Sequence, residues 1–239
     1  ACVLYAFTDH ISSKPLYYYS EKKNGLFALA GEGKFISSLL ADLGLSLNID
    51  NDAVYSLLSF GYLLGDSTPL QEVRKIPYGT VLKVNMLTFE EERIDYFSLK
   101  KVPNRASRED TIDRIDEYIC AAVEREWRKD TEYGYSHFSF LSGGLDSRVN
   151  MLLALELGFE EISALTFSEP NTLDQVVAEE IAEREGIAHR FIPLSGEYLL
   201  ESTAQYIGAN DGLAAFFGAA HVVNAMRSID LSSLGLGHS

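Results

Sequence analysis

The chain has 239 residues, of which 46% are hydrophobic and 23% are charged, a composition typical of globular proteins and not of disordered ones. Its 35 acidic and 20 basic residues give a formal net charge of −15, so we expect no nucleic-acid partner. No apolar run approaches the roughly 20 residues that span a bilayer, and we expect no membrane partner. Its two cysteines, Cys2 and Cys120, match no metal or redox spacing, which favours a reduced, cytoplasmic setting.

The N-terminal part, residues 1–104, combines short strand signals with two helical stretches. β-rich runs separated by turn residues predict the strands, and apolar spacing predicts the helices. We therefore expect a mixed α+β segment here. The predicted strands are Val3–Thr8, Leu16–Ser20, Leu26–Ala30, Thr80–Val84 and Thr88–Arg93, and the predicted helices are Lys34–Leu43 and Asp52–Leu64.

From residue 105 to residue 239 the pattern changes to alternating helices and strands. Ser107 with Asp110, and Thr172 with Gln175, fit capping boxes that open helices. Repeated β-α-β units predict a parallel sheet covered on both faces, that is, a doubly wound α/β domain. The predicted strands are His137–Leu141, Ile162–Phe167 and Ala188–Pro193, and the predicted helices are Leu145–Leu157, one that Gly186 ends, and a helical region from about Glu197 to Ser228.

The segment Ser142–Ser147 (Ser-Gly-Gly-Leu-Asp-Ser) joins a predicted strand directly to a predicted helix. We call it the Gly-Gly loop. Glycines let the backbone approach an oxyanion, and the free amides at a helix start stabilise negative charge. Asp146 would repel a phosphate unless a cation lay between them, which indicates Mg²⁺. The loop therefore predicts a phosphate site, the plainer alternative being an ordinary strand-to-helix turn.

The Gly-Gly loop resembles the PP-loop of the ATP pyrophosphatases, and weaker matches around it resemble the asparagine synthetase family. In that family the first domain is an N-terminal-nucleophile glutaminase, and the second is a PP-loop synthetase. The weaker matches follow the family's order along nearly the whole chain. They are Asp9-His10 with Lys14–Tyr19, Leu26–Ala30 with Lys34, Phe60–Asp66, and Ile76–Gly79.

The resemblance implies an ATP-dependent ligase that adenylates a carboxylate and forms an amide with ammonia from glutamine. Asparagine made from aspartate is the default product. The implied cofactors are ATP and Mg²⁺, and the implied partners are small molecules (ATP, an amino-acid carboxylate, glutamine or ammonia), with a possible homodimer. The implied pyrophosphate ligands are Ser142, Gly143, Gly144, Leu145, Asp146 and Ser147, with Asp146 also on Mg²⁺. The implied adenine-flanking residues are Leu141, Phe167 and Gly237.

The same resemblance implies that both domains are incomplete. Residues 1–104 correspond to the late part of the glutaminase domain, and residues 105–239 end before the acidic pair that supplies a second metal ligand. His238 stands near the place of that loop's glutamate. Two alternatives stay open: a β-lactam-synthetase-like or polysaccharide-cluster amide ligase, and a non-catalytic nucleotide-binding remnant. Whether this chain is itself catalytic is open as well.

Other polar residues give weaker signals. The five histidines show no metal-ligand spacing. His137 is expected at a strand start and His221 in a helix. Asp174 either points at a substrate amine or only complements a helix dipole.

Overall fold

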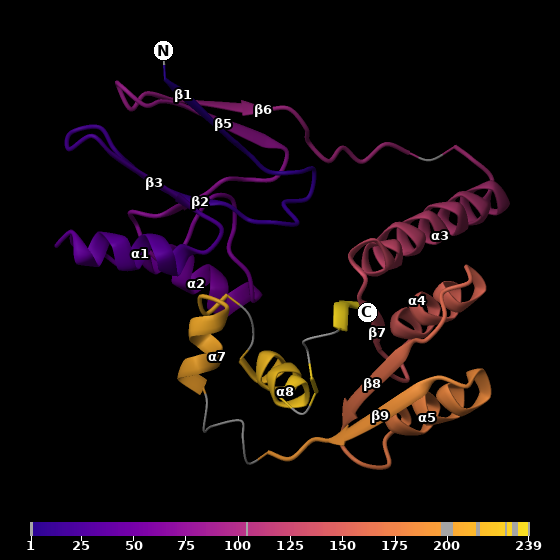
Figure 1. Cartoon of the computed structure of the whole chain (residues 1–239). Helices are drawn as coiled ribbons and strands as arrows, with labels where there is room; N and C mark the ends of the chain where they lie inside the picture. The colour runs from indigo at the N-terminus through magenta and orange to yellow at the C-terminus, as the bar shows by residue number, and fades with distance from the viewer. Residues whose placement is uncertain are drawn as a thin grey trace. The chain divides into compact units, whose positions relative to one another are not determined.

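The computed structural model describes residues 2–103, 105–196, 203–213, 216–227, 229–230 and 234–238. The chain divides into two compact units. The first unit is Ala1–Val102 with Ala204–Phe216, and the second is Pro103–Thr203 with Phe217–Ser239. Both units combine helices with strands (Figure 1), so the chain is of mixed α/β class, as predicted. Among the described residues, no helix is long and apolar enough to cross a membrane.

In the part of the chain that the structure describes, the first unit contains two antiparallel sheets. The first sheet has the order β1-β5-β6, from Val3–Phe7, Thr80–Asn85 and Glu91–Asp95. The second has the order β3-β2-β4, from Leu26–Ala30, Tyr17–Glu21 and Arg74–Lys75. The helices of this unit are α1 (Gly33–Asp42), α2 (Asn51–Phe60) and, from residue 204 onward, α7 (Thr203–Ala209).

The tyrosines of β2 show how this unit forms its core. Side chains alternate between the two faces of a strand. Tyr17 and Tyr19 therefore share a buried cluster with Ile36 of α1, while Tyr18 packs in the other cluster with Leu82 of β5. Strand β2 thus packs against helix α1 on one face and against the first sheet, β1-β5-β6, on the other.

Two predicted boundaries in the first unit are wrong. Helix α2 ends at Gly61, whose φ of 77° is left-handed, so the helix does not reach Leu64. Glycine adopts this conformation at little cost, which makes it a common helix terminator. Strand β6 begins at Glu91 and not at Thr88, because the Asn85 side chain accepts a hydrogen bond from the Thr88 amide (3.3 Å) and holds a turn there.

The second unit contains a parallel sheet of order β10-β7-β8-β9. The predicted strands are found with ends shifted by about one residue, as is usual for such boundaries. The strands are β7 (Ser136–Phe140), β8 (Ser163–Ser168), β9 (Ala188–Pro193) and β10 (Leu234–His238), and the helices are α3 (Arg108–Tyr133), α4 (Leu145–Glu156), α5 (Leu173–Glu185) and α8 (Phe216–Met226).

The helical region expected from about Glu197 to Ser228 contains two helices in the part that the structure describes. Helices α7 and α8 are separated by a turn at Asn210–Gly212, where Asp211 has φ 56° and Gly212 has φ 69°. Residues 197–202, 214–215 and 228 lie outside the described part of the chain.

Apolar side chains cover the parallel sheet on both faces. On one face, Trp127 of α3 and Met151 of α4 share a cluster with Ala164 of β8, to which α5 also contributes. On the other, Phe138 of β7 packs with Ala225 of α8. Figure 1 shows α4 and α5 beside β8 and β9. Fully burying a side chain such as Met151 stabilises the fold by about 1.5–3 kcal/mol.

The first of the two predicted capping boxes, at Ser107 and Asp110, is supported by a hydrogen bond. The Ser107 hydroxyl accepts a hydrogen bond from the Asp110 amide (2.9 Å) at the start of α3. The second is wrong. Thr172 is the N-cap of α5, but its side chain makes no cap hydrogen bond. Its hydroxyl donates instead to the Glu169 carbonyl (2.9 Å).

Candidate functional site

The Gly-Gly loop lies where β7 leads into α4, the strand–turn–helix setting that such a motif requires. Its two serines hold it together. The Ser147 hydroxyl accepts from the Ser142 amide (3.1 Å) and lies 2.8 Å from the Ser142 hydroxyl. Ser142 Oγ also accepts from the Gly144 amide (3.1 Å). The loop is therefore ordered by its own side chains at the start of a helix.

Gly143 is the point of closest approach between the loop and α5. Its amide donates to Asp174 Oδ1 at 2.9 Å. A Cβ at this position would lie 2.9 Å from the Leu173 carbonyl oxygen and 3.1 Å from Asp174 Oδ1. Glycine is needed here for space. The sequence left the role of Asp174 open. In the structure its carboxylate accepts a hydrogen bond from the Gly143 amide of the loop.

Asp146 and Arg148 bring charges of both signs to the first turn of α4. Asp146 is exposed, so its carboxylate is accessible to a cation. Arg148 Nε donates to the Gly144 carbonyl (3.0 Å), which holds the guanidinium beside the loop. Sequence reasoning missed Arg148. Its position four residues after Gly144, one helical turn, was the available signal.

Leu141, expected beside the adenine, is buried directly before the loop. Its amide donates to the Leu165 carbonyl (2.9 Å), and its carbonyl accepts from the Thr166 hydroxyl (2.6 Å). Thr166 Oγ1 lies 2.8 Å from Nε2 of His189 on β9. Burial lowers the pKa of His189, against a smaller opposing effect of Glu179. These contacts link β7, β8 and β9 near the point where β7 leads into the loop.

Phe167 and Gly237, also expected to flank the adenine, both lie against Phe140. The rings of Phe140 and Phe167 meet edge to face, with centroids 5.8 Å apart. A Cβ on Gly237 would lie 3.2 Å from the Phe140 ring. The structure therefore brings the two predicted residues to one aromatic ring, which sequence reasoning did not include among the site residues.

His238 lies in a second polar group, which the histidine spacing did not predict. It is buried in β10, and its Nε2 lies 2.7 Å from Oδ2 of Asp130 on α3. His137 Nδ1 lies 3.2 Å from the same oxygen. We call Asp130, His137 and His238 the Asp–His cluster. His238 is more than a hundred residues from Asp130 and His137 in the sequence, so no local spacing marks the cluster.

Comparison with known families assigns most of the chain. Residues 3–96 match the family model described as a glutamine amidotransferase domain, and residues 114–227 match the model described as asparagine synthase. No curated protein matches the chain.

Among solved structures, the chain is similar to the crystal structure of a predicted subunit of tRNA methyltransferase from Methanocaldococcus jannaschii DSM. The sequences are 23% identical, and the match covers 41% of this chain and 50% of that protein, with a TM-score of 0.28. The chain thus spans about half the length of that protein, and a similarity this distant supports no transfer of function.

Proposed function

Because the chain belongs to the asparagine-synthetase-like family, we propose that it is part of an ATP-dependent amidotransferase. In this proposal the second unit binds Mg²⁺·ATP at the Gly-Gly loop and adenylates a carboxylate, which an amine then converts to an amide. The default carboxylate is aspartate, with asparagine as product. The amine is ammonia, either free or released from glutamine by a complete glutaminase domain.

The observation that carries the proposal is the contact between Gly143 and Asp174. The Gly143 amide, at the junction of a strand with a helix, already donates to a carboxylate oxygen at 2.9 Å. A backbone amide that holds one oxyanion can hold a phosphate oxygen in its place. The Ser142 and Ser147 hydroxyls lie next to it and add donors to the same anion.

The residues around the loop fit Mg²⁺ as well as phosphate. Asp146 offers an accessible carboxylate in the first turn of α4, and oxygen ligands of this kind are those that Mg²⁺ prefers. A bound Mg²⁺ would supply positive charge to the phosphates. The chain's own part is to orient the phosphates by its amides and hydroxyls, and to add the positive charge of Arg148, which is held at the Gly144 carbonyl.

The fold proposed with this function is a doubly wound sheet in a synthetase domain of residues 105–239, preceded by a glutaminase-type segment of residues 1–104. The apolar clusters on both faces of the parallel sheet support the first part. In such sheets ligands bind at the carboxyl ends of the strands. The Gly-Gly loop follows the carboxyl end of β7, and the end of β8 carries Phe167 close by in the strand order.

Calorimetric titration of the full chain with Mg²⁺·ATP tests the proposal. We expect Asp146→Ala to weaken binding by about 1.5–3 kcal/mol, the range for a hydrogen bond or contact to a charged group. Asp110→Ala removes an acid from the first turn of another helix in the same unit, α3. This matched control should bind as the wild type does.

Two outcomes would contradict the proposal. One is equal affinity of the wild type and Asp146→Ala for Mg²⁺·ATP. The other is an equal loss in Asp146→Ala and Asp110→Ala, because a general effect of negative charge would then replace the specific contact. Circular dichroism of each variant separates a lost contact from a lost fold.

A further inference from the structure

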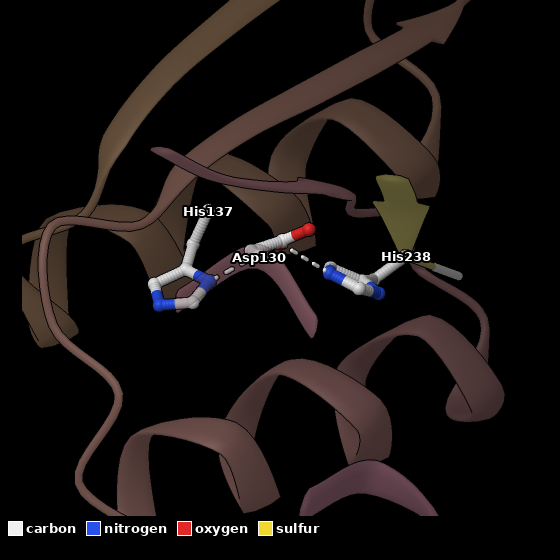
Figure 2. A group of neighbouring side chains, drawn as sticks. All are labelled: Asp130, His137 and His238. Atoms are coloured by element: carbon white, nitrogen blue, oxygen red, sulfur yellow. Dashed lines mark hydrogen bonds and ion pairs between the residues drawn. The ribbon is translucent and has the colours of Figure 1, made fainter. Parts of the chain in front are cut away.

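The Asp–His cluster is a buried polar group between helix α3 and strands β7 and β10 of the parallel sheet. The side chains of Asp130 and His238 are 1% and 0% exposed, and that of His137 is 12% exposed. Figure 2 shows Asp130 lying between the two imidazole rings, one from β7 and one from β10. Their three potential ligand atoms all lie within 4.8 Å of one another. Three groups with metal-binding atoms therefore converge on one buried point.

Aromatic rings form the wall of this site. The Trp127 indole stacks on the His238 ring at 4.4 Å and an interplanar angle of 17°, and lies 5.5 Å from the His137 ring. Trp127 Nε1 donates away from the cluster, to Asn150 (3.0 Å). Phe159 meets His137 edge to face at 5.2 Å. The apolar wall fixes the orientation of both imidazoles and limits the access of water.

Glu126 adds the outer contact typical of a metal-binding histidine. Its Oε1 lies 3.2 Å from Nδ1 of His238, while Nε2 of the same ring faces Asp130. A carboxylate on the far nitrogen selects the tautomer whose other nitrogen carries a free lone pair for a metal. Glu126 is one helical turn before Asp130 on α3, so the helix places both carboxylates at this one ring.

From this arrangement we propose that the second unit binds a divalent transition-metal ion of the zinc type, held by Asp130 Oδ2, His137 Nδ1 and His238 Nε2. Two imidazoles and a carboxylate are a recurrent ligand set for such ions. The site is independent of the Gly-Gly loop and of its proposed Mg²⁺.

Two of the three distances between ligand atoms are compatible with an ion after a small movement, and the third pair, the two imidazole nitrogens, lies within 4.8 Å. Bonds of about 2.0–2.1 Å in tetrahedral geometry separate two ligand atoms by about 3.3 Å. His137 Nδ1 is already 3.2 Å from Asp130 Oδ2, and the 2.7 Å between His238 Nε2 and that oxygen has to widen slightly.

His238 presents Nε2 to Asp130 and Nδ1 to Glu126. An ion held by the three ligands would link α3, β7 and β10, because each of these elements contributes one ligand.

The test uses the full chain, stripped of metal by a chelator and titrated with Zn²⁺ by calorimetry and with Co²⁺ by visible spectroscopy. We expect one ion per chain and the intense visible absorption of four-coordinate Co²⁺. His137→Gln and His238→Gln should lose the ion. Glu126→Gln should bind it about 10- to 100-fold more weakly, as is usual when the outer partner of a ligand is removed.

Two variants serve as matched controls. His10→Gln removes a histidine that packs on Tyr96 and Phe97 in the first unit, and Asp146→Ala removes the carboxylate of the Gly-Gly loop. Both should keep the ion, so failure of the Mg²⁺·ATP proposal leaves this result unaffected.

Circular dichroism establishes folding first. If the fully buried His238→Gln unfolds, the test rests on His137→Gln and on Glu126, whose side chain is 49% exposed. The proposal is overturned if the folded wild type binds neither Zn²⁺ nor Co²⁺ at micromolar concentration. It is also overturned if folded His137→Gln and Glu126→Gln both bind with wild-type affinity.

Discussion

Asp174→Asn tests whether the Asp174 carboxylate competes with phosphate for the Gly-Gly loop. Asp174 Oδ1 accepts from the Gly143 amide at 2.9 Å. Asparagine keeps an oxygen that can accept the same hydrogen bond, so the loop should keep its position while the negative charge disappears. The first turn of α5 loses an acid that complements its dipole, which costs about 0.3–1 kcal/mol of stability. The fold should therefore survive the change.

The expected gain in affinity follows from the charge that is removed. Two unit charges about 4 Å apart repel by about 1 kcal/mol in water and about 4 kcal/mol at an effective dielectric constant of 20. Asp174 is exposed, so the lower end applies, about 1–2 kcal/mol. That corresponds to pyrophosphate binding roughly 5- to 30-fold tighter in Asp174→Asn when no divalent cation is present.

The assay is calorimetric titration with pyrophosphate, first with a chelator and then with Mg²⁺. We expect the full gain with the chelator and a smaller difference with Mg²⁺, because the cation screens the carboxylate from the phosphate. Glu180→Gln removes one exposed charge from the same helix and should change little. Weaker pyrophosphate binding by Asp174→Asn in the chelator would refute the competition. An equal gain in Glu180→Gln would show that only net charge matters.

Two further predictions concern stability. Asp211 accepts from the amide of Gly33 (2.7 Å) at the start of α1, whose own N-cap residue, Glu32, makes no side-chain cap hydrogen bond. Asp211→Ala should therefore lower the free energy of unfolding by about 1 kcal/mol in urea denaturation, and an unchanged midpoint would contradict this. Burial lowers the pKa of His189 in the folded state. As the pH decreases below about 6.5, the unfolded state therefore binds more protons than the folded state, and the free energy of unfolding decreases. His189→Gln should flatten this fall in melting temperature between pH 7.5 and 5.5, and equal slopes would show that His189 does not contribute.

The Gly-Gly loop could be predicted because all its information is local. A buried strand, two glycines and an amphipathic helix follow one another within a short segment, and each has its own period or turn signal. Asp174 shows where this reasoning stops. Its helix start was visible in the sequence, but its contact with Gly143 depends on β7 and β8 being neighbours in the sheet. Sequence spacing carries no information about that adjacency.

Most strand boundaries were predictable for the same local reason, and the failures, β6 among them, have a physical cause. Thr172 and Gln175 have the spacing of a capping box, yet the Thr172 hydroxyl donates to Glu169. A threonine hydroxyl can bond to nearby backbone on either side of a helix start, and these options compete. A spacing rule identifies the residues able to cap a helix, and the surrounding turn decides which bond forms.

The Asp–His cluster depends on strand order even more than the contact between Asp174 and Gly143 does. His137 and His238 stand on β7 and β10, which are adjacent in the sheet although about a hundred residues apart in the chain. Trp127 and Asp130 lie on one helix face at the spacing that i and i+3 residues share, so the helix pattern alone already pairs a carboxylate with a buried aromatic ring. What the sequence lacks is the strand order that places both histidines above that face. Once the order β10-β7-β8-β9 is known, a buried aspartate on α3 needs partners, and the histidines of β7 and β10 supply them. Strand order, and not residue spacing, is therefore the information that turns scattered histidines into a candidate metal site.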